Sequence, residues 1–258
     1  MKANYHTHTF RCKHAYGAER EYIETAIEKG LTILGFSDHV PVPYPDGIVS
    51  GIRMDVSQIP DYTETLLKLR EEYRSDIRIL IGYEAEYMPV FFDGMIKKIQ
   101  EYPLDYLIQG QHYVPDEVQG SYAGRPTREE SDLRDYVDLT IEGMKTGVFS
   151  YLAHPDLINY QGDLKTYRKH MQRLIRTSID LSIPLELNIL GFVTGRNYPC
   201  DTFFSLASDM GATFIVGLDA HSPEYILLPN EIPDFMDFLD RYHIQPTEEI
   251  AFPLKEQK

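Results

Sequence analysis

The sequence contains no tryptophan, only two cysteines and few basic residues for its length. Cys12 and Cys200 are too few for a disulfide framework, which favours a reducing, cytoplasmic environment. With 25 basic against 40 acidic residues the net charge is -15, and no basic patch suited to phosphate backbones is present. No apolar run approaches the roughly 18 residues of a membrane span, and we expect no signal peptide before His6. These absences predict a soluble, cytoplasmic protein whose partners are neither nucleic acids nor membranes.

The sequence does contain a repeated alternation of short apolar runs and helical patterns. Its 258 residues, 43% of them hydrophobic, are enough for a single catalytic domain over 1–258 with a sizeable core. Strands that alternate with helices build either a closed parallel barrel or a doubly wound sheet, and seven such units favour an α/β barrel of the (β/α)7 kind. The predicted strands are 4–9, 33–39, 78–87, 106–112, 149–154, 185–189 and 214–221, and the predicted helices lie around 22–27, 62–73, 95–99, 136–144, 167–175, 203–210 and 235–242.

Residue types that bind metals occur at the ends of the predicted strands. In His6-Thr7-His8, the alternation of side chains along a strand projects two imidazoles from one face. One histidine at a strand end is more often an ordinary hydrogen-bonding residue, but here the pattern recurs, and the carboxyl ends of a parallel barrel share one rim. Nitrogen ligands mixed with carboxylates suit zinc, manganese or iron, and more than four ligands imply more than one ion. The residues concerned are His6, His8, His39, Glu84, His112, His154, Glu186, Asn188, Asp219 and His221.

The stretches around these residues resemble the polymerase and histidinol phosphatase (PHP) superfamily, and within it the histidinol-phosphatases. They are His6-Thr7-His8 with Cys12-Lys13-His14, Ser37-Asp38-His39, Gly82-Tyr83-Glu84, Gly110-Gln111-His112, Ala153-His154-Pro155-Asp156, Glu186-Leu187-Asn188 and Asp219-Ala220-His221. The resemblance implies the PHP fold, a distorted TIM-like barrel of seven strands that binds two or three divalent ions. The implied ligand sets are His6, His8, Glu84 and Asp219 for one ion, Glu84, His112 and His154 for a second, and His14, His39 and His221 for a third.

The resemblance also implies a reaction. We expect a phosphoric monoester hydrolase that converts L-histidinol phosphate to L-histidinol and phosphate in histidine biosynthesis. In this hypothesis a metal-bound hydroxide attacks phosphorus in line, and the ions neutralise the charge that develops on the phosphoryl oxygens. The predicted catalytic residues are Glu84, Asp219 and His221.

Arginines on loops at the rim are predicted to bind the phosphate, because a guanidinium pairs with phosphate through parallel hydrogen bonds. The two candidates are Arg53, in the proline-containing loop 40–60, and Arg196, after the predicted strand 185–189. Two roles are open for Glu186 and Asn188. They would contact the ammonium or imidazole of an amino-alcohol substrate, or they would hydrogen-bond the metal ligands.

Two other functions fit the same residues. One is a PHP phosphoesterase that acts on another phosphomonoester or on a nucleotide. The other is a non-catalytic, metal-dependent binding module, which would be expected to have a closed and fully ligated site. Long loops are predicted at 40–60 and 113–126, and such loops are typical of an open, functional site, so they favour an enzyme.

Overall fold

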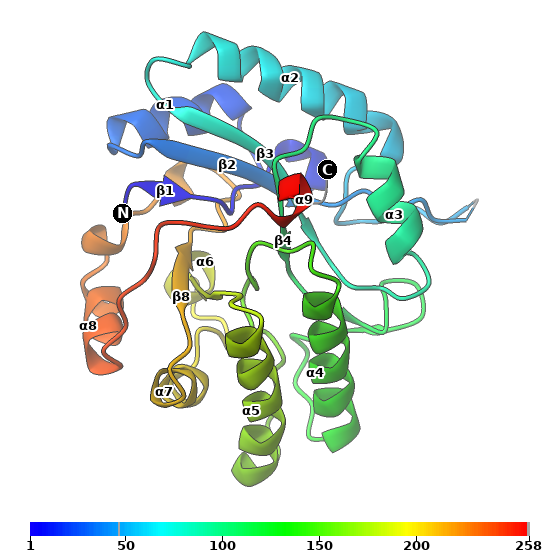
Figure 1. Cartoon of the computed structure of the whole chain (residues 1–258), viewed down its shortest axis with the longest axis vertical. Helices are drawn as coiled ribbons and strands as arrows, with labels where there is room; N and C mark the ends of the chain where they lie inside the picture. The colour runs from blue at the N-terminus through cyan, green and yellow to red at the C-terminus, as the bar shows by residue number, and fades with distance from the viewer. Residues whose placement is uncertain (46, 257–258) are drawn as a thin grey trace.

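The computed structural model describes residues 1–45 and 47–256 and shows an α/β protein built on parallel strands (Figure 1). Four strands lie side by side in the order β1-β2-β3-β4, and two more, β7 and β8, pair with each other. All of these pairs are parallel, and nearly every residue in them is buried, as expected when helices and a barrel interior cover the two faces. The strands are β1 (Ala3–Asn4), β2 (Ile33–His39), β3 (Arg78–Ala85), β4 (Tyr106–Gln109), β7 (Leu185–Asn188) and β8 (Phe214–Gly217).

Single bridges join the two groups of strands into a closed ring. Gln109 at the end of β4 pairs with Leu152, and Leu152 pairs in turn with Leu185 in β7. On the other side Thr7, just after β1, pairs with Ala220, just after β8. The order around the ring is β1, β2, β3, β4, the segment at Leu152, β7 and β8, so the predicted distorted barrel with seven positions is confirmed.

The fifth position of this ring differs from the prediction of a strand over 149–154. Only Leu152 forms bridges there, although Ala153 N also donates to Gln109 O at 2.7 Å. His154 has a φ of 28°, in the left-handed region, and Pro155 follows it. The chain therefore leaves the strand direction at His154, and the extended stretch before it is too short for a ladder.

Helices cover the outside of the barrel (Figure 1). The predicted helices are confirmed with shifted ends, and α4 and α5 lie side by side along one edge of the molecule in Figure 1. Among the described residues, no helix combines the length and the hydropathy that crossing a bilayer requires. The helices are α1 (Glu19–Glu28), α2 (Ile59–Glu72), α3 (Phe92–Ile99), α4 (Glu130–Lys145), α5 (Leu164–Asp180), α6 (Ile189–Val193), α7 (Asp201–Asp209), α8 (Pro233–Arg241) and α9 (Pro253–Glu256), with 3-10 turns η1 (Phe10–Cys12), η2 (Val56–Gln58), η3 (Pro223–Tyr225) and η4 (Pro229–Glu231).

Several predicted boundaries are wrong. The strands predicted at 4–9, 106–112 and 214–221 end earlier, at Asn4, Gln109 and Gly217. The two predicted loops also differ from the structure. The stretch 113–126 is not irregular throughout, because β5 (Tyr113–Val114) and β6 (Ser121–Tyr122) form a short antiparallel hairpin. The Asp116 carboxylate accepts hydrogen bonds from two backbone N–H groups, at 2.7 and 2.8 Å, and so stabilises the turn. The loop predicted at 40–60 ends at residue 55, where η2 and then α2 begin.

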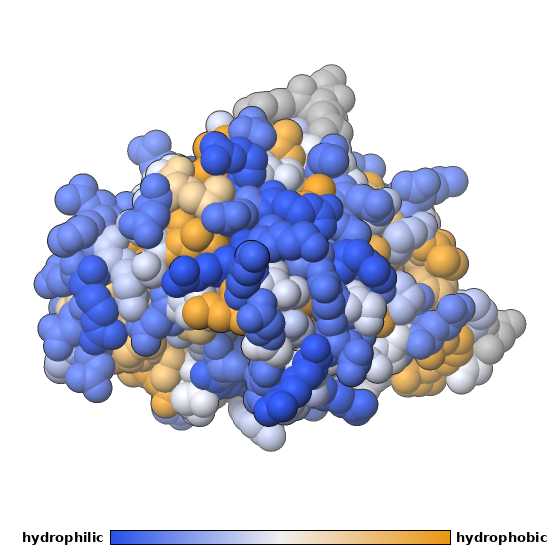
Figure 2. Space-filling model, turned by 90° about the horizontal axis from the view of Figure 1, so that it is seen from below, coloured by the Kyte–Doolittle hydropathy of each residue, from blue (hydrophilic) through white to orange (hydrophobic). Residues whose placement is uncertain are grey.

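The interior of the barrel is filled by side chains rather than open. Tyr106 from β4 is fully buried, and its hydroxyl donates to the carbonyl of Tyr5 at 2.7 Å. Gly35 and Gly82 leave room for this ring: a Cβ at these positions would lie 2.3 Å and 2.5 Å from Tyr106 atoms. Figure 2 views the molecule from below and shows a surface that is mainly hydrophilic, with apolar residues in separate patches. The side chains that fill the barrel interior support the polar residues at the ends of the strands.

Candidate metal centre

The nine predicted metal ligands meet at one end of the barrel, at the ends of β2 and β3 and in the segments that follow the other strands and η1. β2 and β3 place His39 directly opposite Glu84 in the sheet register. The bridge between Thr7 and Ala220 sets His6 and His8 beside the segment of Asp219 and His221. The ligands therefore come from residues more than two hundred positions apart in the sequence, and the closure of the ring brings them together. The nine are His6, His8, His14, His39, Glu84, His112, His154, Asp219 and His221.

Glu84 lies at the centre of the group, and its two carboxylate oxygens face different histidines. Oε1 is 2.8 Å from His154 Nε2 and 3.5 Å from His112 Nε2. Oε2 is 3.0 Å from His39 Nδ1 and 3.5 Å from the Nε2 atoms of both His6 and His8. A carboxylate placed in this way can bridge two ions, as the family resemblance implies.

The position of Glu84 depends on a glycine in the neighbouring segment. A Cβ atom at Gly110 would lie 1.9 Å from Glu84 Oε1, which is far inside van der Waals contact. Gly110 comes directly after β4, and its N–H donates to the carbonyl of Ala85 at 3.1 Å. The glycine in Gly110-Gln111-His112 is therefore required by the close approach of the bridging carboxylate.

Asp219 forms a second junction. Its Oδ1 lies 3.1 Å from His8 Nε2, 3.5 Å from His6 Nε2 and 3.3 Å from His221 Nδ1. Asp219 has a φ of 52°, in the left-handed region, as does His154. Backbone strain at residues other than glycine concentrates at functional sites, because the surrounding structure must hold it in place.

We call His6, His8, Glu84, His112, His154 and Asp219 the inner group, and His14, His39 and His221 the outer group. In the outer group, His221 Nε2 is 3.0 Å from His14 Nε2, and the rings of these two residues stack at 4.7 Å. His14 follows η1 and is exposed, and its Nδ1 lies 2.7 Å from the carbonyl of Cys12. His14, His39 and His221 each offer one ring nitrogen, and these three atoms lie within 4.8 Å of one another.

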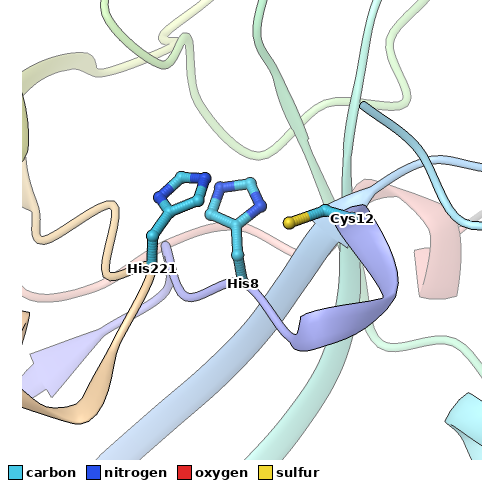
Figure 3. A group of neighbouring side chains, drawn as sticks. All are labelled: His8, Cys12 and His221. Atoms are coloured by element: carbon cyan, nitrogen blue, oxygen red, sulfur yellow. The ribbon is translucent and has the colours of Figure 1, made fainter. Parts of the chain in front are cut away.

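Cys12 is a further neighbour of the inner group. Figure 3 shows the imidazole of His8 between His221 and the Cys12 thiol, with one ring nitrogen on the side of the sulfur. The ligand atoms of these three residues lie within 4.8 Å of one another. Cys12 is fully buried, and burial raises the pKa of its thiol, so the sulfur carries its proton at neutral pH.

Buried polar atoms without hydrogen-bond partners indicate that the residues of the centre fit divalent ions. His6 Nε2, both ring nitrogens of His8, His39 Nδ1 and Glu84 Oε2 are buried without a hydrogen-bond partner among the described residues. Unpartnered buried polar atoms are costly in a folded protein, and their convergence here indicates a ligand with positive charge. Imidazole nitrogens mixed with carboxylate oxygens match zinc, manganese or iron.

The carboxylates of the centre are ionised, and they act on the histidines around them. Burial alone would lower the pKa of His6, but the carboxylates of Glu186, Asp219 and Glu84 outweigh it and raise the pKa to about 10. Burial would raise the pKa of Glu84, but the histidines around it hold that pKa well below its usual range. In the outer group, burial and the neighbouring His221 lower the pKa of His14 to about 4. The carboxylates are thus ionised, and the outer imidazoles are neutral, which is the form that binds metal.

A cavity of about 490 Å³ opens above the centre. Asp219, His112 and the three outer histidines line it, together with Arg196. Arg196 donates to the hydroxyl of Tyr198 at 2.8 Å. Tyrosines supply much of the remaining wall, among them Tyr16, Tyr113, Tyr122 and Tyr225.

Three other predicted substrate residues do not line this cavity. Arg53 is only 1% exposed and forms ion pairs with Glu86 and Glu117. Glu186 Oε1 is 2.8 Å from His6 Nδ1, and Asn188 Nδ2 donates to Glu186 Oε2 at 2.9 Å and to Asp219 Oδ2 at 3.1 Å. For Glu186 and Asn188 these bonds favour the second of the two predicted roles, support of the metal ligands. Substrate contact by these residues and by Arg53 stays a prediction.

Sequence reasoning missed two carboxylates. Asp38 Oδ1 lies 3.6 Å from His8 Nδ1, and Glu86 Oε1 lies 3.4 Å from His112 Nδ1. The available signal was strand periodicity, because Glu86 is two residues from Glu84 and so falls on the same face. Asp38 precedes a ligand directly and gives no such signal.

The fold and the site together define a class of protein. The family profile of the PHP domain matches residues 4–189, and this chain belongs to the PHP domain family. Within that family, a protein of Deinococcus radiodurans named probable histidinol-phosphatase is 28% identical over 225 residues, which cover 84% of this chain and 85% of the relative. A protein of Schizosaccharomyces pombe with the same name is 25% identical over 252 residues, covering 88% and 82%.

A solved structure shares the fold over almost the whole chain. It is the histidinol phosphate phosphatase of Lactococcus lactis, complexed with zinc, L-histidinol and phosphate. The TM-score is 0.73 at 18% identity, and the match covers 97% of this chain and 98% of the other. This similarity confirms the predicted PHP-type barrel.

Proposed function

We propose that this protein is a metal-dependent phosphatase that hydrolyses L-histidinol phosphate to L-histidinol and phosphate. The observation that carries the proposal is the convergence of nine ligand residues, several with unpartnered buried atoms, next to a cavity that five of them line together with Arg196. The names of the two relatives and the contents of the Lactococcus lactis structure support this choice of substrate.

The inner and outer groups would hold the ions. We assign His6, His8, Glu84 and Asp219 to one ion, Glu84, His112 and His154 to a second, and the outer group to a third. When bound, divalent ions such as zinc or manganese would supply Lewis-acid chemistry and lower the pKa of a coordinated water toward neutrality.

The protein's own groups would position the substrate beside these ligands. The Arg196 guanidinium lines the cavity and is permanently charged, so it can pair with the phosphoryl oxygens. Asp219 and His221 line the same cavity, with Asp219 Oδ1 and His221 Nδ1 3.3 Å apart, and this pair can hold a proton next to the reacting group. We keep Glu84, Asp219 and His221 as the proposed catalytic residues, Glu84 because its two oxygens connect the ligand sets.

The tyrosine wall suits the organic part of this substrate. L-histidinol carries an imidazole ring and an ammonium group, and the faces of tyrosine rings attract both aromatic and cationic groups. Tyr16, Tyr113, Tyr122 and Tyr225 line the cavity together with Asp219, His221 and Arg196. This wall supports histidinol phosphate over a phosphomonoester without an aromatic or cationic end.

We propose two further points. The first is that residues 1–258 form one catalytic domain. The bridge between Thr7, after β1, and Ala220, after β8, closes the ring of strands. The second is that the protein works in the cytoplasm with a small-molecule phosphomonoester as its partner, since Cys12 and Cys200 are both free thiols.

A phosphate-release assay with added zinc or manganese tests the proposal. The substrate panel would contain histidinol phosphate, a nucleoside monophosphate and an aliphatic phosphomonoester. We expect the highest kcat/KM with histidinol phosphate. A preference for the nucleotide would favour the broader PHP phosphoesterase, and metal binding without release from any substrate would favour a binding module.

A further inference from the structure

Three histidines of the inner group have a buried carboxylate opposite the ring nitrogen that points away from the centre. Glu186 Oε1 is 2.8 Å from His6 Nδ1, Asp38 Oδ1 is 3.6 Å from His8 Nδ1, and Glu86 Oε1 is 3.4 Å from His112 Nδ1. The Nε2 atoms of the same rings face Glu84 and Asp219, as described above. Glu186 hydrogen-bonds His6 Nδ1, whereas Asp38 and Glu86 make no hydrogen bond to the Nδ1 atoms they face and attract the Nδ1 proton through their charge. In each case a proton on Nδ1 leaves the Nε2 lone pair free for a metal.

Glu86 differs from the other two carboxylates because it has a buried arginine as partner. Arg53 Nη2 forms an ion pair with Glu86 Oε1. Arg53 is also the largest of the fully buried side chains among the described residues. The other oxygen of Glu86 accepts from the N–H of Tyr113 at 3.0 Å.

Stability is a weak explanation for this pair. Removing two charges from water costs several kcal/mol for each ion, and a buried ion pair often stabilises a fold no better than apolar residues of the same volume. Arg53 also has a buried Nη1 atom without a hydrogen-bond partner among the described residues, which adds to its cost. A function other than packing is therefore expected.

The metal centre indicates what that function is. We propose that Arg53 and Glu86 are positioning residues for the metal centre: Arg53 holds the Glu86 carboxylate against His112 Nδ1, so that His112 Nε2 faces Glu84 in the form that binds metal. This inference rests on the proposed metal-dependent function, and it gives Arg53 a role other than the predicted phosphate contact.

The same arginine connects the two long loops beside the cavity. Arg53 Nε donates to Glu117 Oε2 at 2.8 Å, and Glu117 also accepts from the hydroxyls of Tyr44 at 3.0 Å and Ser50 at 2.7 Å. Glu117 lies in the turn of the β5–β6 hairpin, whose residues Tyr113 and Tyr122 line the cavity. Arg53 thereby fixes a metal ligand and the cavity wall relative to each other.

The test measures metal affinity directly, by competition of the metal-free protein with a chromophoric chelator for zinc and for manganese. In Glu86→Gln we expect the binding of one ion to weaken by about 10-fold to 100-fold, the usual effect of losing a carboxylate behind a ligating histidine. The remaining ions should keep their affinity. The matched control is Arg70→Met, which removes the arginine of another partly buried ion pair, with Asp105, outside the centre.

A second variant separates positioning from simple charge balance. Arg53→Met/Glu86→Gln removes both charges of the buried pair and leaves Glu117 with the hydroxyls of Tyr44 and Ser50 as hydrogen-bond partners, so the variant should retain the native circular dichroism spectrum. If its metal affinity stays reduced as in Glu86→Gln, the inference is supported. If either variant binds all ions like the wild type, the pair only balances charge in the core and the inference is overturned. Failure of the wild type to bind any metal would instead overturn the proposed function.

Discussion

The inner and outer groups of the metal centre differ in burial and in charge. The inner group has two carboxylates, Glu84 and Asp219, both ionised and almost fully buried, and further carboxylates stand behind its histidines. The outer group has three imidazoles and no carboxylate of its own, and one of them, His14, is exposed. Anionic ligands hold a divalent ion more strongly than neutral ones at the same distance. From this comparison we propose that the inner group would hold its ions tightly and that the outer group would hold a more accessible, more easily exchanged ion next to the cavity.

The strongest way to break this comparison is Glu84→Gln. The substitution keeps the shape of the side chain but removes the negative charge of a carboxylate whose two oxygens face five histidines. We expect kcat/KM for histidinol phosphate to fall roughly 1000-fold, about 4 kcal/mol of transition-state stabilisation. Elemental analysis of the purified protein should show loss of inner ions. Unchanged metal content together with unchanged activity would show that Glu84 does not connect the ligand sets.

Gly110→Ala disturbs the same carboxylate without changing any ligand. The added Cβ would lie 1.9 Å from Glu84 Oε1, so the carboxylate must move. Because misplacement by about 1 Å can cost 100-fold in rate, we expect a loss of about that size in kcat/KM.

The matched control is Gly94→Ala in α3, where the nearest neighbour of a new Cβ is the Pro43 side chain, 3.8 Å away. This control should keep full activity and gain up to about 1 kcal/mol of stability from better helix propensity. Equal activity of the two alanine variants in the phosphate-release assay would count against the close approach at Gly110.

Arg196→Ala separates the cavity wall from both metal groups. We expect KM to rise about 30-fold, since a hydrogen bond to a charged group contributes about 2 kcal/mol. Metal content should not change, because Arg196 touches the cavity and Tyr198 rather than a ligand. Steady-state kinetics and elemental analysis of one preparation test both parts. A fall in kcat alone, at constant KM, would contradict a role in holding the phosphate.

His14→Ala sharpens the difference between the groups with the smallest effect. We expect kcat/KM to fall about 10-fold, roughly 1.4 kcal/mol, because only the outer ion loses a ligand. Titration of the wild type with a chelator should remove this ion first, and the variant should lack that first step. A single cooperative loss of all ions, identical in the two proteins, would show that the groups are not distinct.

Particular residues show how far the sequence could be interpreted. The strand-end pattern of His6, His8, Glu84 and Asp219 predicted a rim of metal ligands, and the family resemblance added His14, which no strand periodicity places there. The strand at 149–154 could not be excluded from its apolar composition, because the turn that shortens it arises from the backbone of His154. The position of Arg53 was equally inaccessible: an arginine in a proline-containing loop is normally at the surface, and only the fold turns it inward against Glu86.

The sequence by itself determined the alternation of strands and helices, the kinds of ligand atoms and their order along the chain. These properties are local, since they follow from periodicity and from the chemistry of each side chain. Only the tertiary structure decided which ligands share a carboxylate, which histidine has which carboxylate behind it, and which polar residues line the cavity. Those relations depend on closure of the barrel through the bridges at Thr7 and Leu152, because contacts between distant segments are set by register and packing and not by any neighbouring residue.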